Sequence, residues 1–249
     1  MLTAERRREI LGRLERDGKV VASELVASLG VSEDTVRRDL RDLSAQGLLQ
    51  RVHGGALAAA PPAGSFARRL EIAHQEKGAL ADAALPLLAG ARVIVLDSGT
   101  TALELARRLP PAFDGTVVTN SPPIAAALAE HPCAGVVLVG GRLLKAEQVA
   151  VGARAVEALR TVRADVCVLG ICSLHPEVGV TANDHDEADV KRAMVACAGE
   201  VIALATADKL RTAGPWVVAG LADVDHLVTD GDAELTREFA AAGIHVVAV

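Results

Sequence analysis

The stretch from Ser32 to Gly47 limits the fold of this chain more than any other part of the sequence. If it is helical, Val36, Leu40 and Leu43 fall on one face, four and three residues apart. Ser32 stands where an N-cap side chain accepts an amide of the first turn, and Gly47 stands where a glycine commonly ends a helix. The stretch therefore predicts a short amphipathic helix with one apolar and one polar face.

A second amphipathic helix is predicted just before it, over residues 21–30, with Leu25 and Leu29 one turn apart. The connection between the two helices is the short turn Gly30-Val31-Ser32, which is typical of a helix-turn-helix. This arrangement favours DNA binding through the polar face of the second helix. That face carries Arg37, Arg38 and Arg41.

Residues 48–57 predict a two-stranded hairpin, because apolar residues alternate around the pair Gly54-Gly55. A hairpin directly behind a helix-turn-helix is the wing of a winged helix. Arg51 and His53 lie on this wing, where they would reach phosphates or a minor groove.

The charge distribution is compatible with DNA binding by the first part of the chain. The whole chain has a net charge of −6, but residues 1–57 hold ten lysines and arginines against nine acids, and the remainder holds sixteen against twenty-three. A solvated helix face, with Asp34 paired to Arg38, is the alternative role for the arginines, but the wing favours DNA. A nearly neutral module needs several copies to bind tightly, so we expect a homodimer or homotetramer on double-stranded DNA with repeated half-sites.

The cysteines and the apolar segments point away from secreted and membrane proteins. Four scattered cysteines form no C-x-x-C pair and are too few for a disulfide framework. The first residues lack the apolar segment of a signal peptide, and no apolar run approaches the length that spans a membrane. We therefore expect a cytoplasmic protein with reduced thiols.

The composition changes after residue 57. Residues 58–65 are rich in alanine, proline and glycine around Pro61-Pro62, which predicts a locally stiff linker. We expect a winged helix-turn-helix domain over residues 1–57, a linker over 58–75 and an α/β domain over 76–249. This last domain opens with a helix from residue 76 to about residue 88.

The α/β domain contains a predicted anion cradle. A buried strand over residues 91–96 runs into the turn Asp97–Thr101 and then into a helix over residues 102–109. Backbone amides, hydroxyl groups and the helix dipole of such a turn favour a negatively charged ligand, although a simple helix cap is the alternative for one turn alone. Further strands between helices predict an open, mostly parallel α/β sheet, which binds ligands outside the carboxyl ends of its strands. These strands cover residues 116–119, 135–139, 166–169, 201–205, 226–229 and 245–249.

The polar residues at the strand ends are candidates for binding a small molecule. Lys209 follows one of these strands and would supply the counter-charge for a phosphorylated metabolite. The complete set is Asp97, Ser98, Gly99, Thr100, Thr101, Thr119, Asn120, Gly140, Gly141, Gly170 and Lys209.

Ordered motifs cover nearly the whole chain. The first part contains Glu5-Arg6, Ile10-Leu11, Val31-Ser32, Thr35-Val36-Arg37-Arg38-Asp39-Leu40, Gly47, Arg51 and His53-Gly54-Gly55-Ala56. The second part contains Asp97–Thr101, Thr119-Asn120, Gly140-Gly141, Val151-Gly152, Leu169-Gly170, Gly179–Thr181, Glu187-Ala188, Lys191–Met194 and Val228–Asp230. In these motifs the chain resembles the DeoR family of bacterial transcription regulators.

The resemblance implies a repressor of a sugar or carbohydrate operon that responds to a phosphorylated sugar or related metabolite. It implies a second domain similar to ribose-5-phosphate isomerase and coenzyme A transferases. Two departures bear on the ligand: Thr206 stands where the family has an acid, and the loop over residues 171–176 lacks the expected glycines. For DNA, the implied base-edge readers are Ser32, Thr35, Arg37 and Arg38, and the implied backbone contacts are Arg41, Arg51 and His53.

Two other functions remain open at this point. An isomerase or coenzyme A transferase on the same sheet would need a positioned carboxylate such as Asp97, but Thr206 and the N-terminal module argue against an enzyme. A metal- or thiol-responsive regulator would use Cys172, His175 and His185, although the acids near His185 suit the first turn of a helix better than a zinc site. We expect no catalytic residue, no metal and no cofactor.

Overall fold

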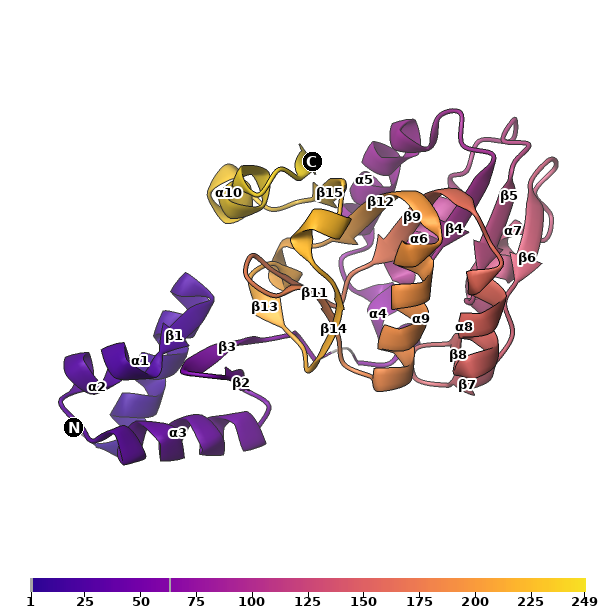
Figure 1. Cartoon of the computed structure of the whole chain (residues 1–249). Coiled ribbons are helices and arrows are strands. Elements are labelled where there is room, and N and C mark those ends of the chain that lie inside the picture. Colours follow the sequence, from indigo (N-terminus) through magenta and orange to yellow (C-terminus); the bar gives the residue numbers. More distant parts are fainter. Residues whose placement is uncertain (1, 63) are drawn as a thin grey trace.

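A small helical domain precedes a larger layered α/β domain in this chain (Figure 1). The computed structural model describes residues 2–62 and 64–249. Met1 and Ala63 fall within the predicted first domain and the predicted linker, and they lie outside the described residues. Within the described ranges, no helix is both long and apolar enough to cross a membrane.

The first domain is the winged helix-turn-helix that the sequence predicts. Its elements are α1 (Thr3–Asp17), β1 (Lys19–Val21), α2 (Ala22–Leu29), α3 (Glu33–Ala45), β2 (Leu49–Val52) and β3 (Gly55–Ala59). Helices α2 and α3 form the helix-turn-helix, and β2 and β3 form the wing, which also pairs antiparallel with β1. Ile10, Leu25, Val36, Leu40 and Leu43 are buried in one apolar core, which confirms the predicted inner face of α3.

Local chemistry sets the ends of α3 and the position of the wing. Ser32 Oγ accepts the amide of Thr35 at 3.3 Å, as an N-cap does. Gly47 follows the helix with a φ of +72°, a conformation that favours glycine. Gly55 is required for another reason, because a Cβ there would lie 2.0 Å from the carbonyl oxygen of Val20. The wing can therefore approach β1 closely.

A buried carboxylate joins α1 to α3. Asp39 is 1% exposed and accepts hydrogen bonds from Arg6 Nε and, at 2.9 Å, from Arg7 Nε. Arg7 also contacts Asp42 at 2.5 Å. Burial alone would raise the pKa of Asp39, but the two arginines outweigh it and hold that pKa below its ordinary value. These ion pairs orient the helix that presents the arginine face.

Seven strands build the sheet of the second domain, and every neighbouring pair is parallel. In chain order they are β4 (Val93–Leu96), β5 (Thr116–Thr119), β6 (Gly135–Leu138), β9 (Ala164–Gly170), β12 (Ala198–Ala205), β15 (His226–Thr229) and β16 (His245–Ala248). Their order in space is β16-β15-β12-β9-β4-β5-β6. The predicted open parallel sheet is confirmed.

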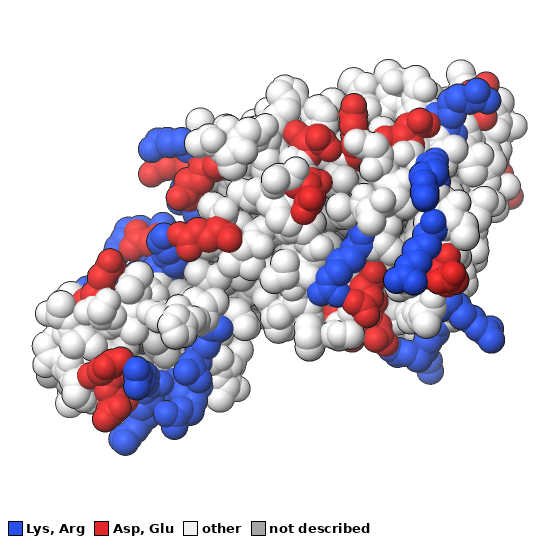
Figure 2. All heavy atoms as spheres, viewed as in Figure 1, with Lys and Arg blue, Asp and Glu red and all other residues white. Residues whose placement is uncertain are grey.

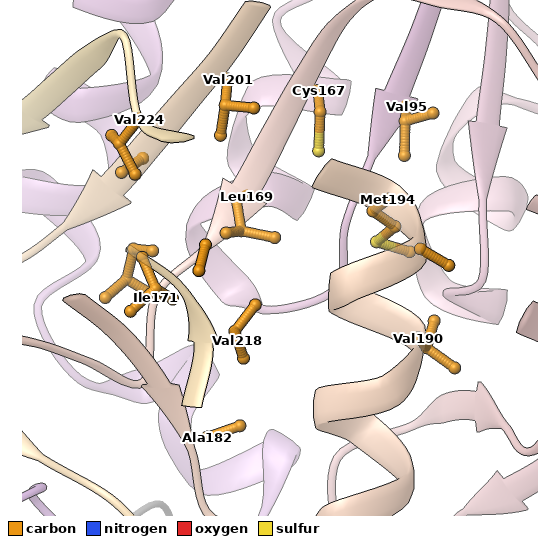
Figure 3. Packing of buried hydrophobic residues seen from close by; sticks show 14 of the residues in the cluster. Val95, Cys167, Leu169, Ile171, Ala182, Val190, Met194, Val201, Val218 and Val224 are labelled. Atoms are coloured by element: carbon orange, nitrogen blue, oxygen red, sulfur yellow. The ribbon is translucent and has the colours of Figure 1, made fainter. Parts of the chain in front are cut away.

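Helices cover both faces of this sheet (Figure 1). The helices are α4 (Phe66–Glu71), α5 (His74–Ala84), α6 (Thr100–Arg107), α7 (Pro122–Leu128), α8 (Ala153–Arg160), α9 (His185–Ala196) and α10 (Ala233–Ala241). Helices α5, α6 and α7 contribute to one apolar cluster, and α8, α9 and α10 contribute to the other. Met194 of α9 and Leu169 of β9 belong to the second cluster (Figure 3).

Shorter elements complete the domain. They are the strands β7 (Arg142–Leu144), β8 (Val149–Val151), β10 (Ser173–His175), β11 (Gly179–Ala182), β13 (Thr212–Ala213) and β14 (Trp216–Ala219), and the 3₁₀ turns η1 (Leu85–Leu88), η2 (Ala207–Lys209) and η3 (Leu221–Asp223).

Two predicted helix boundaries are corrected. The helix expected over residues 102–109 begins earlier, so that Thr100 and Thr101 form its first turn. The helix expected over residues 76–88 gives way to η1, because Pro86 has no amide to continue the α-helical hydrogen bonds.

The wing strand continues into the second domain. Strand β13 pairs in parallel with the end of β3, where Thr212 lies opposite Ala58. The amide of Ala60 then donates to the carbonyl of Ala213 at 3.2 Å. The predicted linker begins at residue 58, but its first residues lie within this shared sheet. The connection between the domains is therefore a strand pairing as well as a covalent segment.

Candidate DNA interface and effector cavity

The predicted DNA-contacting arginines lie on the solvent-exposed surface of the first domain. Arg37, Arg38 and Arg41 are exposed on α3, and Figure 2 shows lysine and arginine side chains gathered at the end of the molecule where α3 lies. Arg37 forms an ion pair with Glu33 at 2.6 Å. The surface ion pair on this helix is therefore Glu33–Arg37, whereas the alternative role for the arginines assumed Asp34–Arg38. In the part of the chain that the structure describes, all three arginine side chains are open to solvent.

The wing brings two further predicted residues beside α3. Arg51 and His53 are exposed and line one hollow together with Arg37. Ser32 and Thr35 lie at the start of α3, with their hydroxyl oxygens 2.9 Å apart. The structure thus brings Arg37 of α3 beside Arg51 and His53 of the wing, although they come from two separate parts of the sequence.

The second domain contains two adjoining cavities beside the carboxyl ends of β4, β9 and β12. The inner cavity measures about 50 Å³ and the outer about 440 Å³. Five residues line both cavities and mark the passage between them: Arg69, Thr100, Ile171, Cys172 and Lys209. The outer cavity alone has the size of a small-molecule site.

The turn between β4 and α6 forms one wall of the inner cavity, as the sequence predicts. Gly99 has a φ of +114° and directs the chain into α6, whose first residues are Thr100 and Thr101. These two hydroxyl-bearing residues and Ser98 are buried and line the cavity. Because the amide groups of a helix start carry partial positive charge, this wall suits an anionic group.

Asp97 is not a free ligand-binding carboxylate. It is 1% exposed and accepts hydrogen bonds from Lys191 Nζ and, at 3.0 Å, from the amide of Gly170. Lys191 also donates to the Gly170 carbonyl at 2.8 Å and lies 3.4 Å from Glu187. Burial alone would lower the pKa of Lys191, but the carboxylates of Asp97 and Glu187 outweigh it and raise that pKa.

This charged network is the part of the site that reasoning from the sequence missed. Glu187 and Lys191 both line the inner cavity and stand four residues apart on α9. That spacing is a recognisable signal for an ion pair on one helix face. The carboxylate that holds Lys191 comes from β4, far away in the sequence, so the pattern on α9 alone does not reveal the network.

Lys209 takes the predicted position at the cavity, next to the altered segment. It follows Thr206, whose hydroxyl donates to Asp208 at 2.5 Å, and both of these residues line the outer cavity. Burial lowers the pKa of Lys209, and the nearby cations Arg69 and Lys191 act in the same direction. An anion bound here would relieve that electrostatic repulsion.

Five predicted effector residues do not lie on the walls of these cavities: Asp97, described above, and Thr119, Asn120, Gly140 and Gly141. Thr119 Oγ1 accepts the amide of Ser121 at 3.1 Å, and Asn120 Nδ2 donates to the carbonyl of Ala150 at 2.9 Å, so their side chains hold the chain around β5 and β8. Gly140 and Gly141 line a separate surface hollow. The expectation that all polar strand ends meet at one place is therefore corrected, because β5 and β6 lie on the far side of β4 from β9 and β12.

The residues of the metal- or thiol-responsive alternative have separate environments. Burial raises the pKa of Cys172 to about 11, which keeps its thiol protonated at neutral pH. His175 is buried and accepts the amide of Glu177, whereas His185 packs against Trp216 with a ring-centroid distance of 4.6 Å. Among the described residues, no group of three or more potential ligands is placed to hold a metal.

Comparison with known proteins identifies a protein family for both parts of the chain. The model of the DeoR-like helix-turn-helix domain matches residues 6–61, and the model of the DeoR C-terminal sensor domain matches residues 72–231. The HTH-type transcriptional regulator GlpR of Haloferax volcanii is 38% identical over 99% of this chain and 98% of its own length. The putative aga operon transcriptional repressor of Escherichia coli O157:H7 is 31% identical over 99% and 94%.

Two further comparisons complete this description. The HTH-type transcriptional repressor GlcR of Bacillus subtilis is 32% identical over 92% of this chain and 89% of its own length. Ribose 5-phosphate isomerase A from Methanocaldococcus jannaschii matches 55% of this chain and 54% of that chain, with 15% identity and a TM-score of 0.40. The three relatives are described as transcriptional regulators or repressors and not as enzymes.

Proposed function

We propose that this chain, which belongs to the DeoR family of DNA-binding transcriptional regulators, represses genes of sugar or carbohydrate metabolism. We propose further that a phosphorylated sugar controls this repression. The effector would occupy the inner and outer cavities of the second domain. The observation that carries the proposal is the inner cavity itself, where the start of α6 and Lys209 face one space.

The composition of this cavity supports an anionic ligand. Thr100 and Thr101 supply hydroxyl groups at the positive end of a helix, and Lys209 supplies a full charge. Asp97 is paired with Lys191 and does not line the cavity, so its carboxylate does not face a bound anion. The larger outer cavity leaves room for the sugar part of a ligand whose phosphate sits inside.

The first domain supports recognition of double-stranded DNA by more than one copy of the chain. A single winged helix contacts few base pairs, so a homodimer or homotetramer on repeated half-sites would provide the affinity and specificity of an operator complex. Effector binding would then favour one arrangement of the two DNA-binding domains over another.

A thermal-shift experiment tests the effector part of the proposal. Ribose 5-phosphate, fructose 6-phosphate and glucose 6-phosphate would be compared with their unphosphorylated parents on the full chain. A ligand at a hundredfold excess over its dissociation constant stabilises the folded state by about 2.7 kcal/mol, which raises the melting temperature by several degrees. If no phosphorylated compound stabilises the protein, or if Lys209→Ala and Thr100→Ala leave the shift unchanged, the proposed effector site is wrong.

A gel-shift experiment with the upstream region of the chain's own gene tests the DNA part. We expect a specific complex at moderate salt that Arg37→Ala weakens and that an effective phosphosugar alters. Binding that competes equally well with unrelated DNA would contradict sequence-specific regulation.

A further inference from the structure

We propose that the outer edge of the seven-stranded sheet, at β6, pairs with the same strand of a second copy of this chain. The two strands run antiparallel about a twofold axis and join the two sheets into one. The inference rests on the proposed function and deepens it, because it names a surface through which copies of the chain associate. This surface lies at the opposite end of the molecule from the first domain (Figure 1).

The backbone of β6 directs hydrogen-bonding groups away from the sheet. Strand β6 is the last strand in the sheet order and pairs with β5 along one edge. The amide of Val139, directly after β6, donates to the carbonyl of Thr119 in β5 at 2.8 Å. Successive residues of a strand direct their N–H and C=O groups to opposite edges, so those of Val136 and Leu138 point away from β5. Within residues 2–62 and 64–249, no strand pairs with this outer edge.

The side chains at this edge are apolar and open to solvent. Val137 is 48% exposed and Leu138 is 50% exposed, although both belong to the main sheet. Exposed sheet edges commonly carry charged residues, prolines or bulges that prevent further pairing. Strand β6 contains no charged residue and no proline, and its register with β5 is continuous. The edge is therefore suited to the addition of another strand.

The turn after β6 leads the chain away from this edge. It contains Gly140 and Gly141, which were predicted as effector residues but lie outside the cavities. A Cβ at Gly141 would lie 2.5 Å from the carbonyl oxygen of Val151, so the glycine allows the chain to pass closely along β8. The next strand, β7, then pairs with β8 instead of β6. The glycine pair thus leaves the outer edge of β6 uncovered.

A second copy of this chain is the partner that fits the edge. Residues 132–141 contain no charged side chain, so two identical segments meet without like-charge repulsion, whereas an acidic or basic partner would gain no ion pair. With Val137 on the twofold axis, residues 136 and 138 of one copy lie opposite residues 138 and 136 of the other. Their outward N–H and C=O groups then bond to each other. The two Val137 side chains meet on one face of the joined sheet, and Leu138 meets Val136 on the other.

Sedimentation velocity of the full chain, without DNA or effector, tests this surface. Val137→Lys places two ammonium groups opposite each other, and Val217→Lys is the matched control, because Val217 is also a strand valine that is 48% exposed. We expect a dimer or larger oligomer for the unchanged protein and for Val217→Lys. The association of Val137→Lys should be weaker by roughly tenfold or more. Circular dichroism and thermal melts would show that both variants are folded.

A cysteine cross-link gives a second readout that does not depend on the lysine variant. Because Val137 directs its backbone groups to β5, the pair across the axis is a non-hydrogen-bonded pair, whose Cα atoms lie about 4.5 Å apart in antiparallel strands and within the range of a disulfide. Cys133 is exposed and is replaced by serine in these variants. In Cys133→Ser, the further change Val137→Cys should form an intermolecular disulfide with oxidised glutathione, whereas Val217→Cys should not.

Two results would overturn the inference without touching the DNA or effector parts of the proposed function. One is unchanged association of a folded Val137→Lys, and the other is the absence of the Val137→Cys disulfide. A monomeric unchanged protein at micromolar concentration would also overturn it, and the gel shift then decides separately whether the chain binds an operator. Conversely, strand pairing that persists while the gel shift and the thermal shift fail would contradict the proposed function alone.

Discussion

Replacing Lys191 by methionine should destabilise the second domain strongly, because it leaves a carboxylate buried without its cation. Lys191 and Asp97 are 2% and 1% exposed, respectively, so bulk water solvates neither charge well. Among the residues that the structure describes, the amide of Gly170 is the other hydrogen-bond donor to Asp97. Removing one member of a buried ion pair costs about 3–5 kcal/mol, which is a large part of the roughly 5–15 kcal/mol that stabilises a typical domain.

Urea unfolding followed by fluorescence measures this cost. Trp216 is the single tryptophan of the chain, and it packs against His185 in the first turn of α9, the helix that carries Lys191. With a denaturant dependence of about 1–3 kcal/mol per molar urea, the expected loss lowers the unfolding midpoint by at least about 1 M. The measurement is made without an effector, because Lys191 also lines the cavity.

A double-mutant cycle separates the ion pair from other effects of the substitution. Asp97→Asn combined with Lys191→Met removes both charges, so the double variant should be more stable than the sum of the two single losses predicts, by about 2 kcal/mol or more. An unchanged midpoint in Lys191→Met would refute the reasoning. So would single losses that simply add, since the two side chains would then not be coupled.

Three further predictions concern other groups. Thermal melts should show that Asp39→Asn destabilises the chain near neutral pH. Because the pKa of Asp39 is lowered, its contribution to folding stability is present above the ordinary aspartate pKa of about 3.9 and is lost as the pH falls through the lowered value. The melting temperatures of the variant and the parent should therefore converge in acid. In salt-dependent gel shifts, Arg41→Ala should weaken binding to all DNA sequences and reduce the salt slope by about 0.9, whereas Arg37→Ala should relax discrimination at one base pair by about 1–3 kcal/mol. Mass spectrometry after iodoacetamide treatment at pH 7.5 should find Cys133, which is exposed, alkylated well before Cys172, which is half-buried and whose pKa is raised to about 11. Faster modification of Cys172 would contradict this difference in exposure and pKa.

The sequence predicted the elements of the fold because their signals are local. The apolar period and the capping residues of α3 lie within sixteen consecutive residues, and each strand of the parallel sheet is a short apolar run. The turn Asp97–Thr101 was recognisable for the same reason. Even the corrected ends of α5 and α6 differ by only a few residues from the prediction.

The composition of the cavity depends on contacts between distant parts of the chain, which local patterns do not contain. Asp97 and Lys191 are separated by more than ninety residues, and Arg69 lies within residues 58–75, which we expected to be a linker. Likewise, the spacing of Asn120 along the chain cannot reveal that β5 lies beyond β4 and away from the cavity. Strand order in space therefore decides which polar strand ends meet.

The shared sheet limits how this chain can be divided and recombined. Along one edge of β3, β1 pairs with residues 55–57 and β13 pairs with residues 58–59. Strands from both domains therefore pair with the same edge of β3. A fragment cut after residue 61 would leave the end of that edge open to pairing with other chains. A hybrid regulator that joins this winged helix to a foreign sensor domain would need a strand in that domain that pairs with β3 as β13 does. A fusion designed from the covalent linker alone would lack this strand pairing between its two domains.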